Sequence, residues 1–287
     1  MTSPFALAAA HLSKRHLLAI AFAIALIVVA SLGPAQSVMS SKAERVSAAK
    51  PTIVLVHGAW ADASSWTRVI QRLHADGYQV RALANPLRTL SGDAAYVRGF
   101  LETVPGPVIL VAHSYGGAVI TNAATGLPNV RALVYINAFA PDEGEDATSL
   151  AGPDSALSVP DPTSVFDLVP PTLPPTATTD LYLKRSTVFK SFATGLSAKE
   201  KAVVWATQRG AAIGALGEPS GVPAWKTTPS WYLLGLEDLI IPRSVQKAMA
   251  VRAGSTIVKY GAGHLGLMTA PGTVARVIER AAAASVH

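Results

Sequence analysis

The stretch from Val108 to Ala118 constrains the fold more than any other part of the chain. It begins as an unbroken apolar run, Val108–Ala112, which is typical of a strand buried on both faces in a parallel sheet. The run ends in His-Ser-Tyr-Gly-Gly and passes directly into an apolar segment of helical character. A serine at the apex of so sharp a turn, here Ser114, is the pattern of a nucleophile elbow. Ala112 replaces the usual first glycine, so the motif is Ala-x-Ser-x-Gly.

Strands and helices alternate on both sides of this stretch. The alternation predicts an α/β fold with a doubly wound, mainly parallel sheet. Apolar runs predict strands over residues 52–57, 78–84, 108–112, 131–138, 230–235 and 255–260. Segments with helical periodicity or helix-capping signals predict helices over residues 65–75, 91–103, 118–124, 201–208, 242–251 and 273–284.

The alternation is interrupted at about residues 142–226. Seven prolines lie within residues 142–176, and they predict loop rather than sheet. Ser197 and Glu200 have the spacing of a capping box in front of the one helix expected in this block. An insertion between two core strands would lie over the carboxyl ends of the strands, where ligands bind in open α/β sheets. We therefore expect residues 142–226 to act as a lid.

The N-terminus has the pattern of a targeting segment. Lys14 and Arg15 precede the apolar run Leu17–Ala30, which is shorter than the ~20 residues that span a bilayer. Small residues up to Ala35 offer a cleavage site. The sequence predicts a signal peptide over residues 1–35, a linker over 36–50, a folded domain over 51–287 and export to the periplasm or medium. The alternative is an uncleaved segment that anchors the protein to a membrane.

The charge of the chain does not favour nucleic acid as a partner. The formal net charge is +6, but residues 1–50 hold five basic side chains against Glu44 and account for +4 of it. No basic run interleaved with aromatics follows, so nucleic-acid binding is not expected. The chain has no cysteine, which excludes disulfides and thiolate metal sites. Neither a metal cluster nor a phosphate-binding glycine loop is evident, and we expect no metal and no cofactor.

A serine hydroxyl needs a base beside it to act as a nucleophile. In proteins with a nucleophile elbow, the serine, the acid and the histidine follow one another along the chain in that order. Only His264 and the terminal His287 follow Ser114, and His264 stands in a glycine-rich loop directly after the last predicted strand. Asp238, after the penultimate strand, is the expected acid that would orient the imidazole. Glu237 and Asp142 remain alternatives for the acid.

The same pattern predicts two backbone donors for a developing oxyanion. One is the N–H of Tyr115, directly after the serine. The other is the N–H of Ala59, in the loop after the first core strand, where Gly58 allows a close backbone approach. His57 and His113 flank the predicted site and are expected to be structural hydrogen-bonding groups.

Taken together, these motifs make residues 51–287 resemble an α/β-hydrolase-fold protein. The stretches His57-Gly-Ala-Trp, His113-Ser-Tyr-Gly-Gly, Gly235-Leu-Glu-Asp and Gly263-His carry the resemblance in order and spacing. The first of them, followed by Trp66, is similar to the plant methylesterase and hydroxynitrile-lyase group. The lyases of that group carry threonine at the position of Gly58 and lysine at that of Leu265, so the resemblance implies ester hydrolysis.

The sequence therefore predicts a serine esterase that acts on a small, apolar carboxylic ester. Two alternatives remain open, namely a non-catalytic small-ligand-binding protein on the same fold and a hydroxynitrile lyase or cofactor-free peroxidase. Gly58, Trp60 and Trp205 are the expected substrate contacts. The insertion and its borders offer aromatic side chains for an apolar pocket: Tyr182, Phe189, Phe192, Trp205 and Trp225.

Overall fold

The computed structural model describes residues 50–285. Its centre is a parallel sheet of six strands in the order β2-β1-β3-β4-β8-β9. The strands are β1 (Thr52–Val56), β2 (Val80–Leu83), β3 (Val108–Ser114), β4 (Val130–Ala138), β8 (Ser230–Gly235) and β9 (Thr256–Tyr260). This arrangement confirms the predicted doubly wound, mainly parallel α/β fold.

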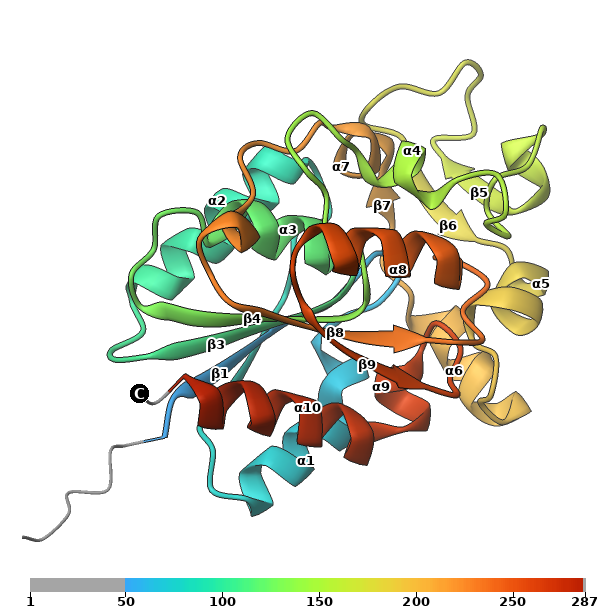
Figure 1. Cartoon of the computed structure of the whole chain (residues 1–287). Coiled ribbons are helices and arrows are strands. Elements are labelled where there is room, and N and C mark those ends of the chain that lie inside the picture. The colour runs from blue at the N-terminus through green and yellow to red at the C-terminus, as the bar shows by residue number, and fades with distance from the viewer. Residues whose placement is uncertain (1–49, 286–287) are drawn as a thin grey trace, which may run out of the picture. The chain divides into compact units, whose positions relative to one another are not determined.

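Helices cover both faces of the sheet (Figure 1). α2 (Leu90–Glu102), α3 (Gly116–Ala123) and α8 (Arg243–Arg252) lie on one face, and α1 (Thr67–Ala75) and α10 (Pro271–Ala284) lie on the other. A 3-10 helix, η1 (Ala63–Trp66), leads into α1, and the short α9 (Gly266–Thr269) precedes α10. All seven residues of β3 are buried, because β1 and β4 flank this strand and helices cover it on both sides. The apolar run that predicted a doubly buried strand thus forms the middle of the core.

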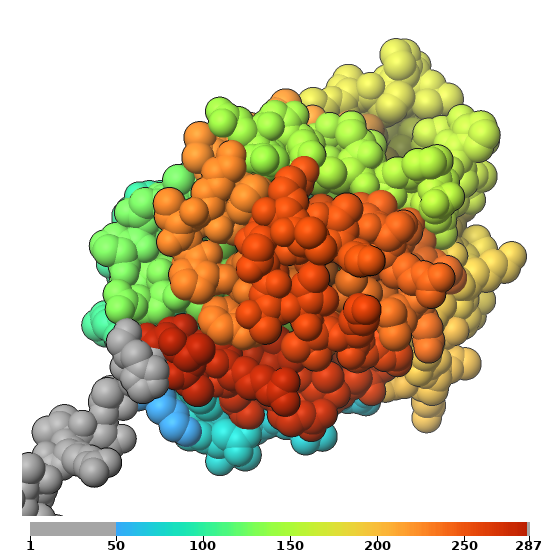
Figure 2. Space-filling view, viewed as in Figure 1, coloured from blue at the N-terminus to red at the C-terminus, as the bar shows by residue number. Residues whose placement is uncertain are grey.

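The insertion lies between β4 and β8 and contains a small antiparallel sheet of its own in the order β5-β6-β7. Its elements are α4 (Ala147–Ala151), η2 (Pro162–Ser164), β5 (Phe166–Val169), β6 (Asp180–Leu183), α5 (Arg185–Thr187), the π-helix η3 (Val188–Phe192), α6 (Ala198–Thr207), β7 (Ala211–Ala212), α7 (Ile213–Gly217) and η4 (Ala224–Lys226). Residues 150–200 extend from the upper right down the right side of the space-filling view (Figure 2).

The expectation that residues 142–176 form only loop is wrong at α4 and β5. The prolines fall just outside β5, at Pro162 and Pro170, and leave four residues free to pair with β6. Phe166 is buried and Asp167 is exposed, which is the alternation of a strand with one covered face. Proline content identified the irregular segments correctly but concealed a strand as short as this one.

The predicted signal peptide, or anchor, lies outside the described residues, as does nearly all of the predicted linker. Among residues 50–285, no helix combines the length and the apolar character that a bilayer span requires.

Candidate functional site

The site begins at the junction of β3 and α3, where the chain turns within a few residues. Ser114 ends β3 with a φ of +54°, a left-handed conformation that costs a non-glycine residue energy. Two glycines make the turn sterically possible. A Cβ on Gly116 would lie 2.7 Å from the carbonyl oxygen of His57, and one on Gly117 would lie 2.2 Å from that of Phe139. The elbow is therefore wedged between the ends of β1 and β4.

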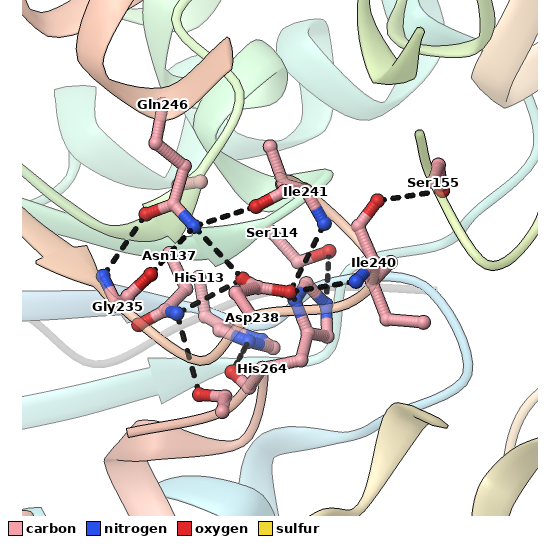
Figure 3. Close-up of polar contacts among 12 residues, drawn as sticks. His113, Ser114, Asn137, Ser155, Gly235, Asp238, Ile240, Ile241, Gln246 and His264 are labelled. Carbon is pink, nitrogen blue, oxygen red and sulfur yellow. Dashed lines mark hydrogen bonds and ion pairs between the residues drawn. The ribbon is translucent and has the colours of Figure 1, made fainter. Parts of the chain in front are cut away.

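Three side chains from the ends of three strands form a hydrogen-bonded relay (Figure 3). The Oγ of Ser114 lies 2.9 Å from Nε2 of His264, and the imidazole Nδ1 lies 2.9 Å and 3.1 Å from the two carboxylate oxygens of Asp238. All three residues are buried. The structure thus brings together the serine, histidine and acid that the sequence singled out, which we call the Ser114–His264–Asp238 relay.

The two alternative acids lie elsewhere. Glu237 is exposed, beside Asp238 in the chain. Asp142, at the start of the insertion, forms an ion pair with Lys226, in which Oδ1 lies 2.7 Å from Nζ. Neither one shares a hydrogen bond with His264.

Four hydrogen bonds hold the Asp238 carboxylate in place. Oδ1 accepts from the backbone N–H groups of Ile240 and Ile241 at 2.8 Å and 3.0 Å. Oδ2 accepts from the side-chain amides of Asn137 at 2.9 Å and Gln246 at 3.1 Å. Every lone pair that does not face the imidazole is therefore occupied, and the orientation of the carboxylate is fixed from all sides.

The same surroundings control the charge of Asp238. Burial alone would raise the pKa of this carboxyl, because it removes water from the ionised form. The neighbouring His264 and the hydrogen bonds from Asn137 and the backbone of Ile241 outweigh burial, and the pKa lies below its ordinary value. The acid is therefore a carboxylate at neutral pH and can stabilise a positive charge on the imidazole.

His57 and His113 are neutral and structural, as the sequence suggested. Nδ1–H of His57 donates to the carbonyl of Gly58 at 2.8 Å, and Nε2 accepts from the N–H of Asn85 at 2.9 Å. Nε2–H of His113 donates to the carbonyl of His264 at 2.9 Å. Burial lowers the pKa of His57 to about 4 and that of His113 to about 3. His113 thereby supports the loop that carries His264.

Two backbone N–H groups border the serine. Among residues 50–285, the N–H groups of Ala59 and Tyr115 donate no hydrogen bond, although both residues are buried. Ala59, Ser114 and Tyr115 line one cavity. The phenol of Tyr115 donates to Asp93 at 2.8 Å, which fixes the residue that carries one of these N–H groups. Unpaired buried donors beside a hydroxyl are suited to an anion that forms there.

The cavity above Ser114 measures about 120 Å³ and is enclosed largely by the insertion. Its other walls are mostly apolar: Trp60, Phe139, Ala147, Thr148, Ala151, Leu157, Ser158, Phe166, Leu181 and Leu216. A larger and more open depression of about 560 Å³ lies at the opposite edge of the sheet, near the starts of β4 and β8. It contains neither the relay nor the free N–H groups, so we assign the functional site to the smaller cavity.

The substrate contacts expected from sequence divide into two groups. Trp60 lines the cavity. Gly58 does not line it but packs against Ser114, with room for no side chain because a Cβ there would lie 2.5 Å from the Cβ of Ser114. Trp205 does not reach the cavity. It lies on α6 with 40% of its surface exposed, on a helix that buries none of its residues. Trp205 is therefore not part of the cavity wall in this structure, and its contact with a substrate stays a prediction.

The other four aromatic candidates also lie outside the cavity wall. Phe192 is fully buried and packs against the imidazole of His264, with ring centroids 5.2 Å apart. Trp225 donates to the carbonyl of Pro141 at 2.9 Å, and Tyr182 packs beside Gly210. Phe189 is partly buried and lies under the guanidinium of an arginine in α5. These rings hold the insertion together and onto the core.

Sequence analysis missed the residues that hold the acid and those that wall the cavity. Asn137 and Gln246 contact Asp238. Asn137 is a polar residue within an apolar stretch, which was the available signal, whereas Gln246 stands among polar residues of a helix and offered none. The hydroxyl of Tyr260 donates to the amide oxygen of Asn137 and completes this support. Phe139 and Phe166 line the cavity from segments whose structure the sequence pattern did not define.

The described residues also bear on metal binding. Among residues 50–285, no group of three or more histidine, aspartate or glutamate side chains has the arrangement of a metal site. The polar atoms that meet at the cavity are the hydroxyl of Ser114, two backbone N–H groups and the hydroxyls of Thr148 and Ser158. Such a set is suited to a nucleophile and an anion rather than to a cation.

Comparisons with known proteins identify a family and similar folds. A model of the Alpha/beta hydrolase family matches residues 53–277. An alpha/beta hydrolase from Aspergillus novofumigatus is 27% identical over 270 residues, a match that covers 83% of this chain and 99% of the relative. A carbendazim hydrolyzing esterase from a Nocardioides species is 38% identical over 113 residues, which cover 34% of this chain and 46% of that protein.

Among solved structures, an extracellular alpha/beta-hydrolase from a Paenibacillus species superposes with a TM-score of 0.66 at 20% identity. The superposition covers 81% of this chain and 99% of the other. At that identity the likeness concerns the fold. The family match spans most of the chain and includes the elbow, the loop of Ala59 and the strand ends that carry Asp238 and His264, and the chain therefore belongs to the alpha/beta hydrolase family.

Proposed function

We propose that this protein is a serine esterase that cleaves carboxylic esters of small, apolar substrates. The observation that carries the proposal is the relay, in which the hydroxyl of Ser114 meets the imidazole of His264 at 2.9 Å and Asp238 holds the far side of that ring. This is the arrangement that converts a weak hydroxyl nucleophile into a strong one.

Each group has one role in the proposed reaction. Ser114 attacks the ester carbonyl while His264 takes its proton, and the ionised Asp238 stabilises the imidazolium. The N–H groups of Ala59 and Tyr115 bind the oxyanion of the tetrahedral intermediate. His264 then protonates the leaving alcohol, and a water molecule activated by the same imidazole releases the acid from the acyl-enzyme.

The cavity supports a small, uncharged acyl group. Its volume of about 120 Å³ is below the ~300–1,000 Å³ of pockets that take drug-sized ligands. Among the described residues, those that line it include no charged side chain. A charged acyl group would be desolvated there without a partner, which is costly. The insertion forms most of the wall and would thereby act as a lid that selects the substrate.

Two positions favour ester hydrolysis over cyanohydrin cleavage. A side chain at position 58 would collide with Ser114, so the threonine that the sequence comparison associates with the lyases has no room here. Leu265 is buried beside the imidazole, where those lyases carry lysine. The Nocardioides relative is named an esterase, which supports the same choice.

Replacement of the nucleophile tests the proposal. Ser114→Ala should lower kcat/KM for p-nitrophenyl acetate by at least about 10³-fold, since only binding and the oxyanion donors remain. Ser158→Ala is the matched control, because it removes another hydroxyl from the same cavity but one that donates to the carbonyl of Gly152 and meets no imidazole. A fluorophosphonate probe should label the wild type and the Ser158 variant but not the Ser114 variant.

The outcome separates the enzyme from a binding protein. Equal hydrolysis by the wild type and Ser114→Ala would overturn the proposed role of Ser114. Absence of ester turnover together with stabilisation by small apolar ligands would identify a non-catalytic receptor on this fold.

We also propose that the protein is exported. Two observations support this: an apolar run follows Lys14 and Arg15, and the similar Paenibacillus hydrolase is extracellular. Expression of the full chain in a Gram-negative host, followed by fractionation and N-terminal sequencing of the product, tests this. A chain that starts near Ala35 in the periplasm is expected. An intact N-terminus in the membrane fraction would indicate the anchored alternative.

A further inference from the structure

Trp60 separates the Ser114 cavity from a second void. Its indole lines the cavity of about 120 Å³ on one side and a smaller void of about 70 Å³ on the other. Among the described residues that line these two spaces, Trp60 is the one they have in common. The side chain is therefore a wall between them.

The second void opens into a groove. The void and an open depression of about 480 Å³ share four lining residues, Ser64, Ser65, Val203 and Met268, so they form one continuous space between η1, α6 and α9. We call this space the α6 groove. Its inner end is closed by Phe192 and Leu265, which are both buried and apolar. Phe192 and Leu265 thus make the inner end of the α6 groove largely apolar, with Asp62 as the one charged side chain among the described residues that line it, and the other end reaches solvent.

The α6 groove lies on the imidazole side of Ser114. Phe192, at its inner end, packs on the ring of His264, and Leu265 follows His264 in the chain. The proposed mechanism requires the alcohol oxygen to approach Nε2 of His264, whereas the carbonyl oxygen faces the N–H groups of Ala59 and Tyr115. The acyl group then occupies the Ser114 cavity, and a long alcohol group would extend toward the α6 groove.

Trp60 is fixed in the position that blocks this path. Its indole N–H donates to the carbonyl of Leu181 at 2.9 Å. Phe166 lies against one part of the ring, with centroids 5.6 Å apart, and Phe192 meets it edge-on at 6.0 Å. The backbone of Trp60 is left-handed, with a φ of +57°, which a tryptophan adopts only when its surroundings enforce it.

We infer that Trp60 is a specificity-determining residue that limits the alcohol part of the substrate, because it divides an acyl cavity around Ser114 from the α6 groove. The inference rests on the proposed esterase function. It concerns esters of linear aliphatic alcohols, whose alkyl chain is uncharged and slender enough for a groove lined by Val203, Phe192 and Leu265. With Trp60 in place, the chain is stopped close to His264, and without it the two spaces join.

The experiment compares two substrate series in purified full-length protein. One series keeps acetate as the acyl group and varies the alcohol from ethyl to octyl, and the other keeps p-nitrophenol and varies the acyl group from acetate to octanoate. In Trp60→Ala, the ratio of kcat/KM for octyl acetate to that for ethyl acetate should rise at least about tenfold, since each buried methylene is worth roughly fourfold. The ratio of kcat/KM for p-nitrophenyl octanoate to that for p-nitrophenyl acetate should change less than the octyl-to-ethyl ratio.

A second substitution tests the route. Val203→Trp places a large ring in the α6 groove from an exposed position on α6, and 60% of the surface of Val203 is exposed. Added to Trp60→Ala, it should remove most of the gain on octyl acetate. Trp205→Ala is the matched tryptophan control, because Trp205 lies on the same helix but lines neither space, and the octyl-to-ethyl ratio should stay at the wild-type value.

Each outcome decides one question. Trp60→Leu accompanies Trp60→Ala in case the larger truncation unfolds the protein, and melting temperatures identify the folded variants. An unchanged octyl-to-ethyl ratio in a folded variant that still hydrolyses ethyl acetate overturns the role of Trp60 and leaves the esterase intact. If kcat/KM rises only for p-nitrophenyl esters of the longer acids, the joined space binds the acyl group and the inference is overturned. Absence of any Ser114-dependent hydrolysis overturns the esterase and the inference together.

Discussion

The carboxyl edge of the six-stranded sheet and the insertion are built in different ways. At the edge, Ser114, Asp238 and His264 are buried, and hydrogen bonds from backbone and side-chain groups fix each of them. In the insertion, the strands have two to four residues and the longest helix, α6, buries none of its ten. Much of its polar anchoring is exposed, such as the ion pair of Lys184 with Asp167.

The difference separates two tasks. The edge is held rigidly because proton transfer and oxyanion binding depend on placement within a few tenths of an ångström. The insertion has fewer buried contacts and belongs to the lower end of local stability. Substitutions at the edge should therefore change the rate, and equivalent substitutions in the insertion should change stability or selectivity.

The sharpest test of this division concerns two aspartates. Asp238→Asn keeps the shape of the side chain but removes the charge that favours the productive tautomer of His264, and kcat should fall by about 10⁴-fold. Asp142→Asn is its counterpart in the insertion and should leave kcat within about threefold, because Asp142 pairs with an exposed lysine. Steady-state kinetics on one ester measure both. A larger loss in the Asp142 variant would reverse the assignment of the acid.

Two glycines give the next largest contrast. A Cβ on Gly58 would lie 2.5 Å from the Cβ of Ser114, and one on Gly210 would lie 2.8 Å from the ring of Tyr182. Gly58→Ala should displace the neighbouring N–H of Ala59 and lower kcat by about 10²-fold, which is typical for loss of one oxyanion donor. Gly210→Ala is as crowded but lies in the insertion, so it should lower the melting temperature with little change in kcat.

A rate loss of similar size in both glycine variants would show that crowding anywhere in the fold disturbs catalysis, and the division between edge and insertion would fail. Gly99→Ala is the baseline for both, because a Cβ at that exposed helical position meets nothing within 4 Å.

The smallest effect concerns the pH dependence of stability. Burial lowers the pKa of His113 to about 3, so unfolding lets this group bind a proton at its ordinary pKa of 6.5. The contribution of neutral His113 to the free energy of unfolding is fully present above pH 6.5 and is lost as the pH falls toward 3. At pH 5 the loss is about 2 kcal/mol. His113→Gln keeps a donor toward the carbonyl of His264 but does not titrate. The free energy of unfolding in urea should therefore fall less between pH 7 and pH 5 in this variant.

His74→Gln is the control for that measurement, because His74 is exposed on α1. Its free energy of unfolding should follow the wild type at every pH. If the free energy of unfolding of His113→Gln falls between pH 7 and pH 5 as much as that of the wild type, other groups account for the acid sensitivity. His57, whose pKa is also lowered, is one such group.

The positions of the relay were predictable because each follows from a local pattern. The apolar run before Ser114 marks a buried strand, and Asp238 and His264 stand directly after two further strands, where parallel topology brings side chains to one edge. The capping box at Ser197 and Glu200 is equally local and is present in the structure. Patterns of this kind depend on neighbours within a few residues, and a single sequence contains them.

The cavity wall was not predictable in the same way. Phe139, Phe166 and Leu216 are far apart in the sequence and meet only because the insertion folds back over Ser114. Trp205 is a large aromatic residue of the kind that often lines pockets, but its side chain on α6 is partly exposed to solvent. Which face of a short, weakly amphipathic helix is covered depends on the whole insertion, and no local period contains that information.

The hydrogen bond from the indole of Trp60 to the carbonyl of Leu181 has a consequence for how such proteins can be recombined. It joins the residue after Ala59 to β6, so the loop that carries the proposed oxyanion donor is tied to the segment that forms the cavity wall. A chimaera that receives a foreign insertion inherits a new wall but loses this acceptor unless the donor segment offers a carbonyl at the same place. Exchange between relatives is therefore constrained at one backbone oxygen, whatever side chains the new segment carries.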